Sequence, residues 1–406
     1  MASNVDRTRL GVGTVSLNRK SERLVRRVLK TKRLSYGPFC QEFEQRFSKA
    51  HGMRFGVLMN SGTSALQVAI ACLAETGKWK PGDEVIVPAL TFIATSNVVI
   101  QQGLKPVFVD VDPKTYNIDP KNIERAITKR TRAIIPVHLF GQPADMGPIM
   151  KIARKYRLKV IEDSCETMYV KHKGKSAGSF GDIACFSTYA AHLIVTGVGG
   201  IAITKSPRYA NILRSLANHG RDGIYISMDD ARGKTGKAFK QMVSRRFRFV
   251  RIGYSYRVTE FEGAIGCAQL DIVKNDILKR RQRNARYLIE KLAPLEAHLQ
   301  LPWVHPDNEH AFMMFPIVIR KGAKTKKRDL VNDLERRGIE TRDMLPLTNQ
   351  PVYKKLLHLK ESRYPVAKWI NANGFYIGCH QDMRKAELDY IVKMFYRYFN
   401  QKKHRA

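Results

Sequence analysis

Three segments of the chain place polar side chains where a bound group could be held. NSGTSAL (residues 60–66) follows the apolar run FGVLM and opens a helical pattern, which predicts Ser61, Gly62 and Thr63 at a helix N-terminus, a position whose free N–H groups bind anions. Asp163 directly follows another apolar run, where a buried carboxylate needs a cation or hydrogen-bond donors. Residues 181–204 predict a strand, a polar turn and a glycine-rich return into a further strand. Each feature alone is also typical of an ordinary helix cap or strand end.

The elements that must position these segments alternate between short apolar runs and amphipathic helical patterns. Such alternation predicts an α/β fold with a mostly parallel sheet covered by helices on both faces. Ligands in such folds bind beyond the carboxyl ends of the strands. The predicted strands of this sheet are residues 55–59, 83–90, 105–111, 132–139, 159–163, 183–188 and 199–204.

The rest of the sequence predicts a domain boundary and a second, smaller domain. Residues 221–251 are basic and lack a period, so we expect an insertion or lid loop there, followed by a long helix over 260–292. The C-terminal third predicts a small α/β domain that ends in a helix. We therefore expect a large three-layer α/β/α domain over 1–270 and a small domain over 271–406.

Composition restricts the class of protein. The 406 residues carry a net charge of +35, and the basic residues occur in clusters along the whole chain, mostly at helical spacing. Solvated helix faces, attraction of an anionic small substrate, and nucleic-acid binding all fit this charge, but no nucleic-acid motif supports the third. The six cysteines stand singly, no apolar run approaches the ~20 residues of a membrane helix, and the first residues have no apolar signal core. We expect a cytoplasmic protein without disulfides, metal or membrane anchor.

The three polar segments, in this order, resemble those of the DegT/DnrJ/EryC1/StrS sugar aminotransferase family of fold type I pyridoxal-phosphate enzymes. PALTFIATSN (88–97), GYSYRVTEFEGAIGCAQL (253–270) and GIETRDMLPLTNQPVY (338–353) extend the resemblance over most of the chain. The resemblance implies a homodimer that acts on a nucleotide-linked sugar, with pyridoxal or pyridoxamine 5'-phosphate as cofactor.

The resemblance also implies roles for individual residues. Asp163 would pair with the pyridine nitrogen and keep the ring an electron sink, and Phe92 would stack on the ring. Ser61, Gly62, Thr63 and Ser187 would hold the phosphate, and Glu166 would lie near the cofactor hydroxyl. Ser255 replaces an Asn through which the family contacts the partner subunit's phosphate, so that contact is expected to be looser or water-mediated.

One departure from the family pattern decides the expected reaction. The spacing from Phe186 and Ser187 that leads to the cofactor-tethering lysine in aminotransferases leads here to His192, and the chain has no lysine between Lys175 and Lys205. Imidazole cannot tether the cofactor, but it can act as a general base near neutral pH. A histidine in this position marks the family's 3-dehydratases of nucleotide-linked 4-keto-6-deoxyhexoses, lyases of deoxysugar, lipopolysaccharide and O-antigen biosynthesis.

Two kinds of 3-dehydratase exist in the family. One holds an iron–sulfur cluster with cysteines of the insertion, whereas this chain has no cysteine between Cys185 and Cys267. The resemblance therefore implies the metal-free kind, in which an amino donor such as glutamate restores the cofactor. A transaminase that works without the lysine, a non-catalytic binding or scaffold protein, and a nucleic-acid binder remain as alternatives.

The nucleotide diphosphate of such a substrate requires cations. The insertion is rich in them, and arginine suits phosphate because its guanidinium presents paired donors. A solvated basic loop is the other interpretation of the insertion. The expected substrate-binding residues are Arg221, Arg245, Arg246, Arg257 and Arg342.

Overall fold

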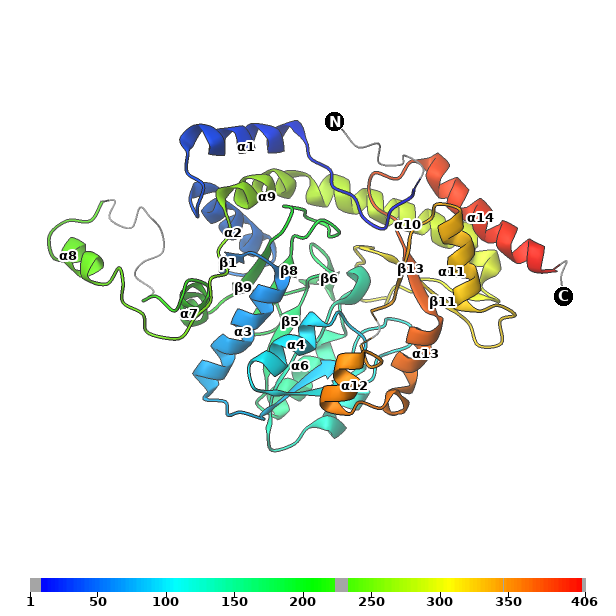
Figure 1. Cartoon of the computed structure of the whole chain (residues 1–406), viewed down its shortest axis with the longest axis horizontal. Coiled ribbons are helices and arrows are strands. Elements are labelled where there is room, and N and C mark those ends of the chain that lie inside the picture. The colour runs from blue at the N-terminus through cyan, green and yellow to red at the C-terminus, as the bar shows by residue number, and fades with distance from the viewer. Residues whose placement is uncertain (1–8, 223–232, 346, 404–406) are drawn as a thin grey trace.

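Seven strands form the central sheet of the computed structural model, which describes residues 9–222, 233–345 and 347–403 (Figure 1). The sheet order is β1-β9-β8-β5-β4-β2-β3. Only β9 pairs antiparallel to its neighbours among these strands, so the carboxyl ends of the other six meet at one edge. The mostly parallel sheet is thereby confirmed. The strands are β1 (Phe55–Met59), β2 (Glu84–Pro88), β3 (Lys105–Val109), β4 (Thr131–Ile134), β5 (Lys159–Asp163), β8 (Ile183–Ser187) and β9 (Gly200–Thr204).

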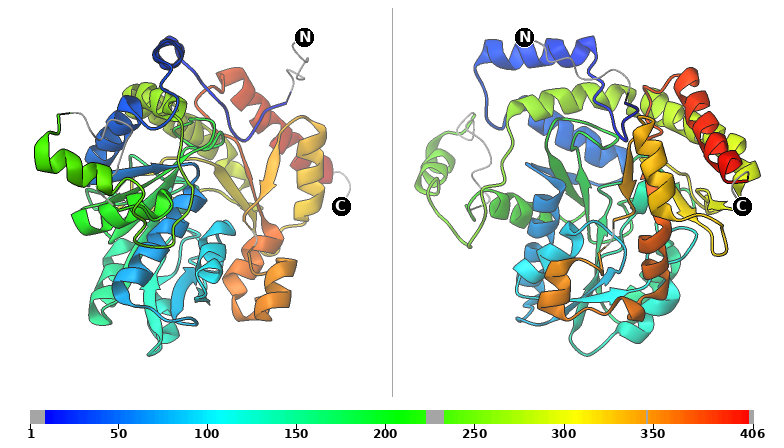
Figure 2. Two further views of the ribbon diagram at one scale, coloured as in Figure 1. Left: turned by 60° about the vertical axis from the view of Figure 1, so that its left-hand side comes forward. Right: turned by 45° about the vertical axis from the view of Figure 1, so that its right-hand side comes forward.

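Helices cover both faces of this sheet because its strands are apolar on both sides. Val85 and Val87 of β2 pack in one core with helices α3, α4 and α7, whereas Ile86 packs in another with α5 and α6. Helices α2 and α9 lie over the β1, β8 and β9 end of that second face (Figure 2). The bounds are α2 (Pro38–Ala50), α3 (Gly62–Gly77), α4 (Ala94–Gln101), α5 (Pro120–Ile123), α6 (Met146–Lys155), α7 (Pro207–Ala217) and α9 (Glu260–Ile272).

A second, antiparallel sheet of order β10-β11-β13-β12 belongs to the C-terminal part of the chain. Its apolar face packs with α10, α11 and α14 in a separate core. Helices α12 and α13 pack instead against the large sheet's layer. Tyr353 of α12 lies in the core shared with β2, α3 and α4, and Asp110 after β3 accepts the N–H groups of Val366 and Ala367 of α13 at 3.0 and 2.9 Å. The bounds are β10 (Leu299–Gln300), β11 (Phe315–Ile319), β12 (Thr341–Asp343), β13 (Gly374–Ile377), α10 (Lys279–Leu292), α11 (Lys327–Arg336), α12 (Pro351–Leu357), α13 (Pro365–Asn373) and α14 (Lys385–Lys403).

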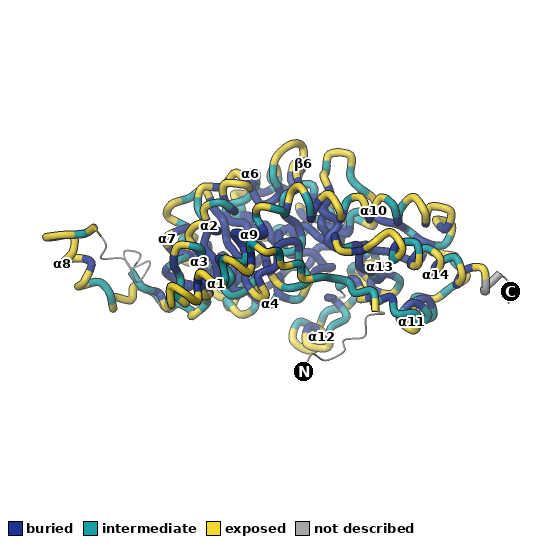
Figure 3. Tube along the Cα trace, turned by 90° about the horizontal axis from the view of Figure 1, so that it is seen from above, coloured by how far each residue is buried: buried dark blue, intermediate teal, exposed yellow. Residues whose placement is uncertain are grey.

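The remaining elements lie at the periphery. Helix α1 (Arg19–Thr31) lies alongside α9, and exposed residues gather on the outer helices while buried ones lie in the interior (Figure 3). A short hairpin is formed by β6 (Lys171–His172) and β7 (Lys175–Ser176). None of the helices in the described residues combines the length and apolar character that crossing a bilayer requires.

Two expected elements differ from the structure. The helix over 260–292 is present, but a π-helical turn, Val273–Leu278, separates α9 from α10. The stretch 221–251, expected as a loop, contains helix α8 (Gly236–Ser244), whose Phe239, Met242 and Val243 have helical spacing around the buried Met242. Residues 223–232 of that stretch lie outside the described residues. The division at residue 270, close to the end of α9, stays a prediction.

Candidate active site

A cavity of about 420 Å³ opens at the carboxyl ends of β1, β2, β5 and β8. Parallel strands deliver their following residues to this edge, so segments far apart in the sequence meet there. Eight of the residues singled out from the sequence line the cavity together: Ser61, Gly62, Thr63, Phe92, Asp163, Glu166, Ser187 and His192.

One end of the cavity is the N-terminus of α3. Ser61 is the N-cap of this helix, and its Oγ accepts the N–H of Ser64 at 3.0 Å. Gly62 fits closely, because a Cβ built there would lie 2.7 Å from Cys165 Sγ and 2.8 Å from Ser187 Cβ. The close approach leaves the first N–H groups of the helix and the hydroxyls of Thr63 and Ser187 around one space, an arrangement that suits a phosphate.

Asp163, the last residue of β5, is a buried carboxylate at the floor of the cavity. Its Oδ2 accepts a hydrogen bond from Thr95 Oγ1 at 2.8 Å, and its Oδ1 accepts the N–H of Cys165 at 3.2 Å. Burial raises the pKa of this carboxyl, and no Lys or Arg of the described residues pairs with it. A protonated ring nitrogen would supply the missing cation.

His192 lies in the turn between β8 and β9, and the hydrogen bond at Nδ1 fixes its tautomer. Its Nδ1 lies 2.6 Å from the carbonyl oxygen of Cys165, which can only accept, so Nδ1 carries the proton. Nε2 then has a free lone pair. Burial lowers the pKa of His192 to about 4, so the ring is neutral at physiological pH, although it is a weaker base than a free imidazole.

Glu166 is the second carboxyl group of the cavity. Its Oε2 accepts the N–H of Phe140 at 2.8 Å. Burial raises its pKa to about 7. The group therefore exists partly as the neutral acid near pH 7 and can then donate a hydrogen bond, as an amide side chain would.

The upper wall of the cavity is apolar. Phe92, between β2 and α4, is exposed over 57% of its surface although it is aromatic. A flat ring bound against it would bury that surface. Met313, Met314 and Tyr376 come from the C-terminal part of the chain and face the same space.

The charge of the cavity contrasts with that of the chain. No Lys or Arg is among the described residues that line it, and these residues offer no group of three or more metal-ligating side chains. The lining within one copy of the described chain therefore supplies no cation.

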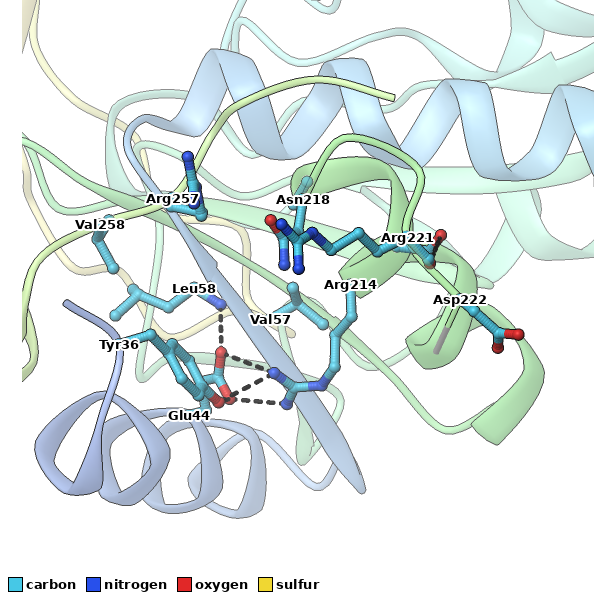
Figure 4. Close-up of a pocket in the computed structure, with 12 residues that line it drawn as sticks. Tyr36, Glu44, Val57, Leu58, Arg214, Asn218, Arg221, Asp222, Arg257 and Val258 are labelled. Carbon is cyan, nitrogen blue, oxygen red and sulfur yellow. Dashed lines mark hydrogen bonds and ion pairs between the residues drawn. The ribbon is translucent and has the colours of Figure 1, made fainter. Parts of the chain in front are cut away.

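The residues expected to bind substrate or the partner lie elsewhere. Arg221 and Arg257 line a smaller space of about 70 Å³ at the root of the insertion, beside Arg214, which is held by Glu44 and Tyr36 (Figure 4). Arg221 donates to the carbonyl oxygen of Arg246 at 3.0 Å, and its guanidinium lies over the rings of Phe247 and Phe249. This arginine anchors the insertion.

Arg257 lies at the surface beside Ser255, to whose Oγ it donates at 3.2 Å. Ser255 is exposed and bridges to Asn218 rather than reaching the cavity.

The other three expected substrate arginines, Arg245, Arg246 and Arg342, are also absent from the cavity lining. Arg245 lies 3.8 Å from a carboxylate oxygen of Asp222. Arg342 on β12 is opposite Tyr376 in register and pairs with Glu340. Within one copy of the described chain these arginines do not meet a common ligand.

Several residues around the cavity were not predicted. Thr95 and Cys165 hold Asp163 and His192, and both stand in segments whose motifs were visible in the sequence. Tyr376, Met313 and Met314 come from the second sheet and its preceding loop, and no local pattern marks them as cavity residues.

The cavity fits pyridoxal phosphate by its own chemistry. It combines an anion seat at a helix N-terminus, an unpaired buried carboxylate for the pyridine nitrogen, and an exposed aromatic face for the ring.

Comparisons with known proteins agree with this assignment. GDP-perosamine synthase of Caulobacter vibrioides is 35% identical over 88% of this chain and 89% of its own length. GDP-4-keto-6-deoxy-D-mannose 3-dehydratase of Escherichia coli O55:H7 is 32% identical over 90% and 94%. An E. coli GDP-4-keto-6-deoxy-D-mannose-3-dehydratase structure with bound hydrated pyridoxal phosphate has a TM-score of 0.85 at 28% identity, over 95% and 98% of the two chains.

These matches confirm the fold type and the cofactor expected from the sequence. The model of the DegT/DnrJ/EryC1/StrS aminotransferase family matches residues 16–396. This chain belongs to the DegT/DnrJ/EryC1/StrS aminotransferase family.

Proposed function

We propose that the protein is a pyridoxamine-phosphate-dependent 3-dehydratase of a nucleotide-linked 4-keto-6-deoxyhexose. The observation that carries the proposal is that His192, with its proton on Nδ1, lines the cavity, whereas no lysine of the described residues does. Among the relatives, dehydratases of this class from E. coli and Yersinia pseudotuberculosis are 32% and 31% identical to the chain.

The proposal gives a role to each cavity residue that was singled out from the sequence. The bound cofactor supplies an amino group for the C4 ketone and a ring that accepts electrons. Asp163 holds the ring nitrogen protonated, Phe92 supports the ring, and Ser61, Gly62, Thr63 and Ser187 hold the phosphate. Glu166 donates to the cofactor's ring hydroxyl when it is protonated.

His192 moves the proton. Loss of the C3 hydroxyl requires a base that accepts a proton and an acid that protonates the departing oxygen. Nε2 of His192 would accept a proton from the carbon that bears the cofactor's amino group, and the resulting imidazolium would return it to the C3 hydroxyl, which leaves as water. The hydrogen bond from Nδ1 to Cys165 keeps the ring oriented through both transfers.

The proposal includes a homodimer with a glutamate-type amino donor. The lining within one copy of the described chain has no Lys or Arg, so a second copy would bring Ser255 to the cofactor phosphate, and Arg257 and the insertion's arginines to the nucleotide diphosphate of the substrate. A relative's structure with a trapped PLP-glutamate geminal diamine supports glutamate as donor.

A transaminase is the second candidate. It is favoured by the perosamine synthase of C. vibrioides, whose 35% identity exceeds that of the dehydratases. It would need His192 to do a lysine's work without covalent attachment of the cofactor.

The deciding experiment offers the purified protein pyridoxamine phosphate, glutamate and a panel of 4-keto-6-deoxy sugar nucleotides. Mass analysis of the products separates the two reactions, since dehydration removes the C3 oxygen and transamination replaces the C4 oxygen by nitrogen. We expect loss of the C3 oxygen and release of ammonia. An amino sugar that keeps its C3 oxygen would favour the transaminase.

A further inference from the structure

Helix α1 presents a band of cations that the reaction does not use. Five exposed basic residues recur at helical spacing over three turns, so they share one face that spans ~16 Å. The opposite face of the helix, with Ser21, Leu24 and Val28, packs inward over α9. The band consists of Arg19, Arg23, Arg26, Arg27 and Lys30.

The cations of this band are not neutralised by the protein. Lys20, at the side of the helix, pairs with Asp271, but no carboxylate of the described chain forms an ion pair with any of the five. Arg27 lies over the ring of Phe39, a contact that leaves its charge uncompensated. Glu22 is the one acidic residue of the helix. Five like charges on one face repel one another. The approach of an anionic surface relieves this repulsion and therefore lowers the electrostatic free energy.

Exposed aliphatic side chains occur in α1 and in the chain on either side of it. Val15 and Leu17 precede the helix, Leu29 lies in its last turns and Leu34 follows it, and each is at least half exposed. Cations beside exposed aliphatic side chains form the combination that binds the interfacial layer of a membrane, where both kinds of group find a partner.

We propose that the outer face of α1, with its flanking aliphatic residues, docks the protein on a bilayer that contains anionic lipids. The binding is peripheral, since the apolar face of α1 is already used against α9. Duplex nucleic acid fits the observations less well, because its phosphates would pair with the cations but leave the four aliphatic side chains in water. A second copy of the chain fits less well too, because its own α1 face has the same sign.

The test compares two variants of equal net charge in the full chain. The first variant is R23Q/R26Q/R27Q/K30Q. The second, K279Q/R283Q/R286Q/K393Q, removes four exposed cations of α10 and α14 for which no ion pair is formed in the described chain. Glutamine keeps helix propensity in both. Co-sedimentation is measured with phosphatidylcholine vesicles, with and without 30% phosphatidylglycerol, and with a 30-base-pair DNA in parallel.

The wild-type protein should sediment with the anionic vesicles and not with pure phosphatidylcholine, and binding should fall as salt rises. Each removed cation should weaken partitioning about fivefold, so the α1 variant should lose several hundredfold and the control less than about threefold. Equal losses in both variants would overturn the proposal, because net charge alone would then explain binding. Absence of vesicle binding, tighter binding to DNA than to vesicles, or a change of oligomeric mass in the α1 variant alone would overturn it as well.

Discussion

The cofactor cavity and the root of the insertion differ in the charge of the side chains that form them. The cavity gathers neutral and acidic side chains around the carboxyl ends of buried strands, and hydrogen bonds fix its ionisable groups, as Thr95 does for Asp163 and the carbonyl of Cys165 does for His192. The insertion root gathers arginines whose donors already serve carbonyl oxygens, carboxylates and aromatic rings. The cavity holds a buried carboxylate without a cationic partner, whereas the arginines of the insertion root make contacts within their own chain.

This difference shows where function can be inferred from a residue's type. Asp163 indicates a ligand site, because a buried carboxylate without a cationic partner is unfavourable unless a bound ligand supplies the positive charge. Arg221 is less informative, because a guanidinium with five donors is easily satisfied by local backbone. Variants in each region test this difference, because they show whether the region affects cofactor affinity, the rate of dehydration or local stability.

The largest effect is expected from His192→Asn. Asparagine can still donate to the carbonyl of Cys165 but has no basic nitrogen, so the proton transfer should be lost while the cavity keeps its shape. We expect dehydration to fall by about 10²- to 10⁴-fold with cofactor affinity nearly unchanged. Product analysis and a cofactor titration monitored by visible circular dichroism measure the two quantities. Retention of most of the activity would show that another group is the base.

Asp163→Asn should separate binding from folding. The amide keeps the hydrogen bond from Thr95 but cannot hold the ring nitrogen positive, so cofactor affinity and turnover should both fall, each by about tenfold or more. Because burial disfavours the charged carboxylate in the free protein, the free energy of unfolding without cofactor should not decrease. Loss of folding together with cofactor binding would assign Asp163 a structural role instead.

Glu166→Gln tests the electrostatics of the same cavity through pH. The pKa of Glu166 is raised by burial to about 7 from an ordinary value of about 4.5, so the folded state holds its proton more strongly than the unfolded state does. This group therefore contributes stability below about pH 4.5, and the contribution is lost as pH rises toward and through 7.

Glutamine removes that dependence. The difference in free energy of unfolding between the variant and the wild-type protein should grow by up to about 3 kcal/mol between pH 5 and pH 8, in favour of the variant. Denaturant unfolding of the cofactor-free protein at several pH values measures it, with Glu296→Gln at the surface as control. A constant difference across this range would contradict the raised pKa.

The sequence was sufficient to predict those parts of the molecule that depend on local order. Strand ends such as Asp163 and Ser187 and the helix start at Ser61 are adjacent in space because parallel strands share one edge, so the pattern of runs was enough. The family spacing placed His192 in the same cavity.

The parts that depend on tertiary contacts could not be predicted. Tyr376 reaches the cavity only because the second sheet packs beside the first, and the partner of an arginine such as Arg221 is a backbone carbonyl with no sequence signature. The helix α8 was missed because its period covers only nine residues among many charges.

The smallest effect is expected at the insertion root, from Arg221→Gln. The variant loses the bond to the carbonyl of Arg246 and the contact with two phenylalanine rings, which together amount to about 1–2 kcal/mol of local stability. Amide hydrogen exchange over residues 233–249 should then rise about tenfold. Cofactor affinity should stay within about twofold, because no residue of the root lines the cavity within one copy.

Arg248→Gln is the matched control, since its exposed side chain lies 3.5 Å from Asp222 and such pairs contribute little. A fall in cofactor affinity in the Arg221 variant, with exchange unchanged, would join the two regions into one site and remove the distinction between them.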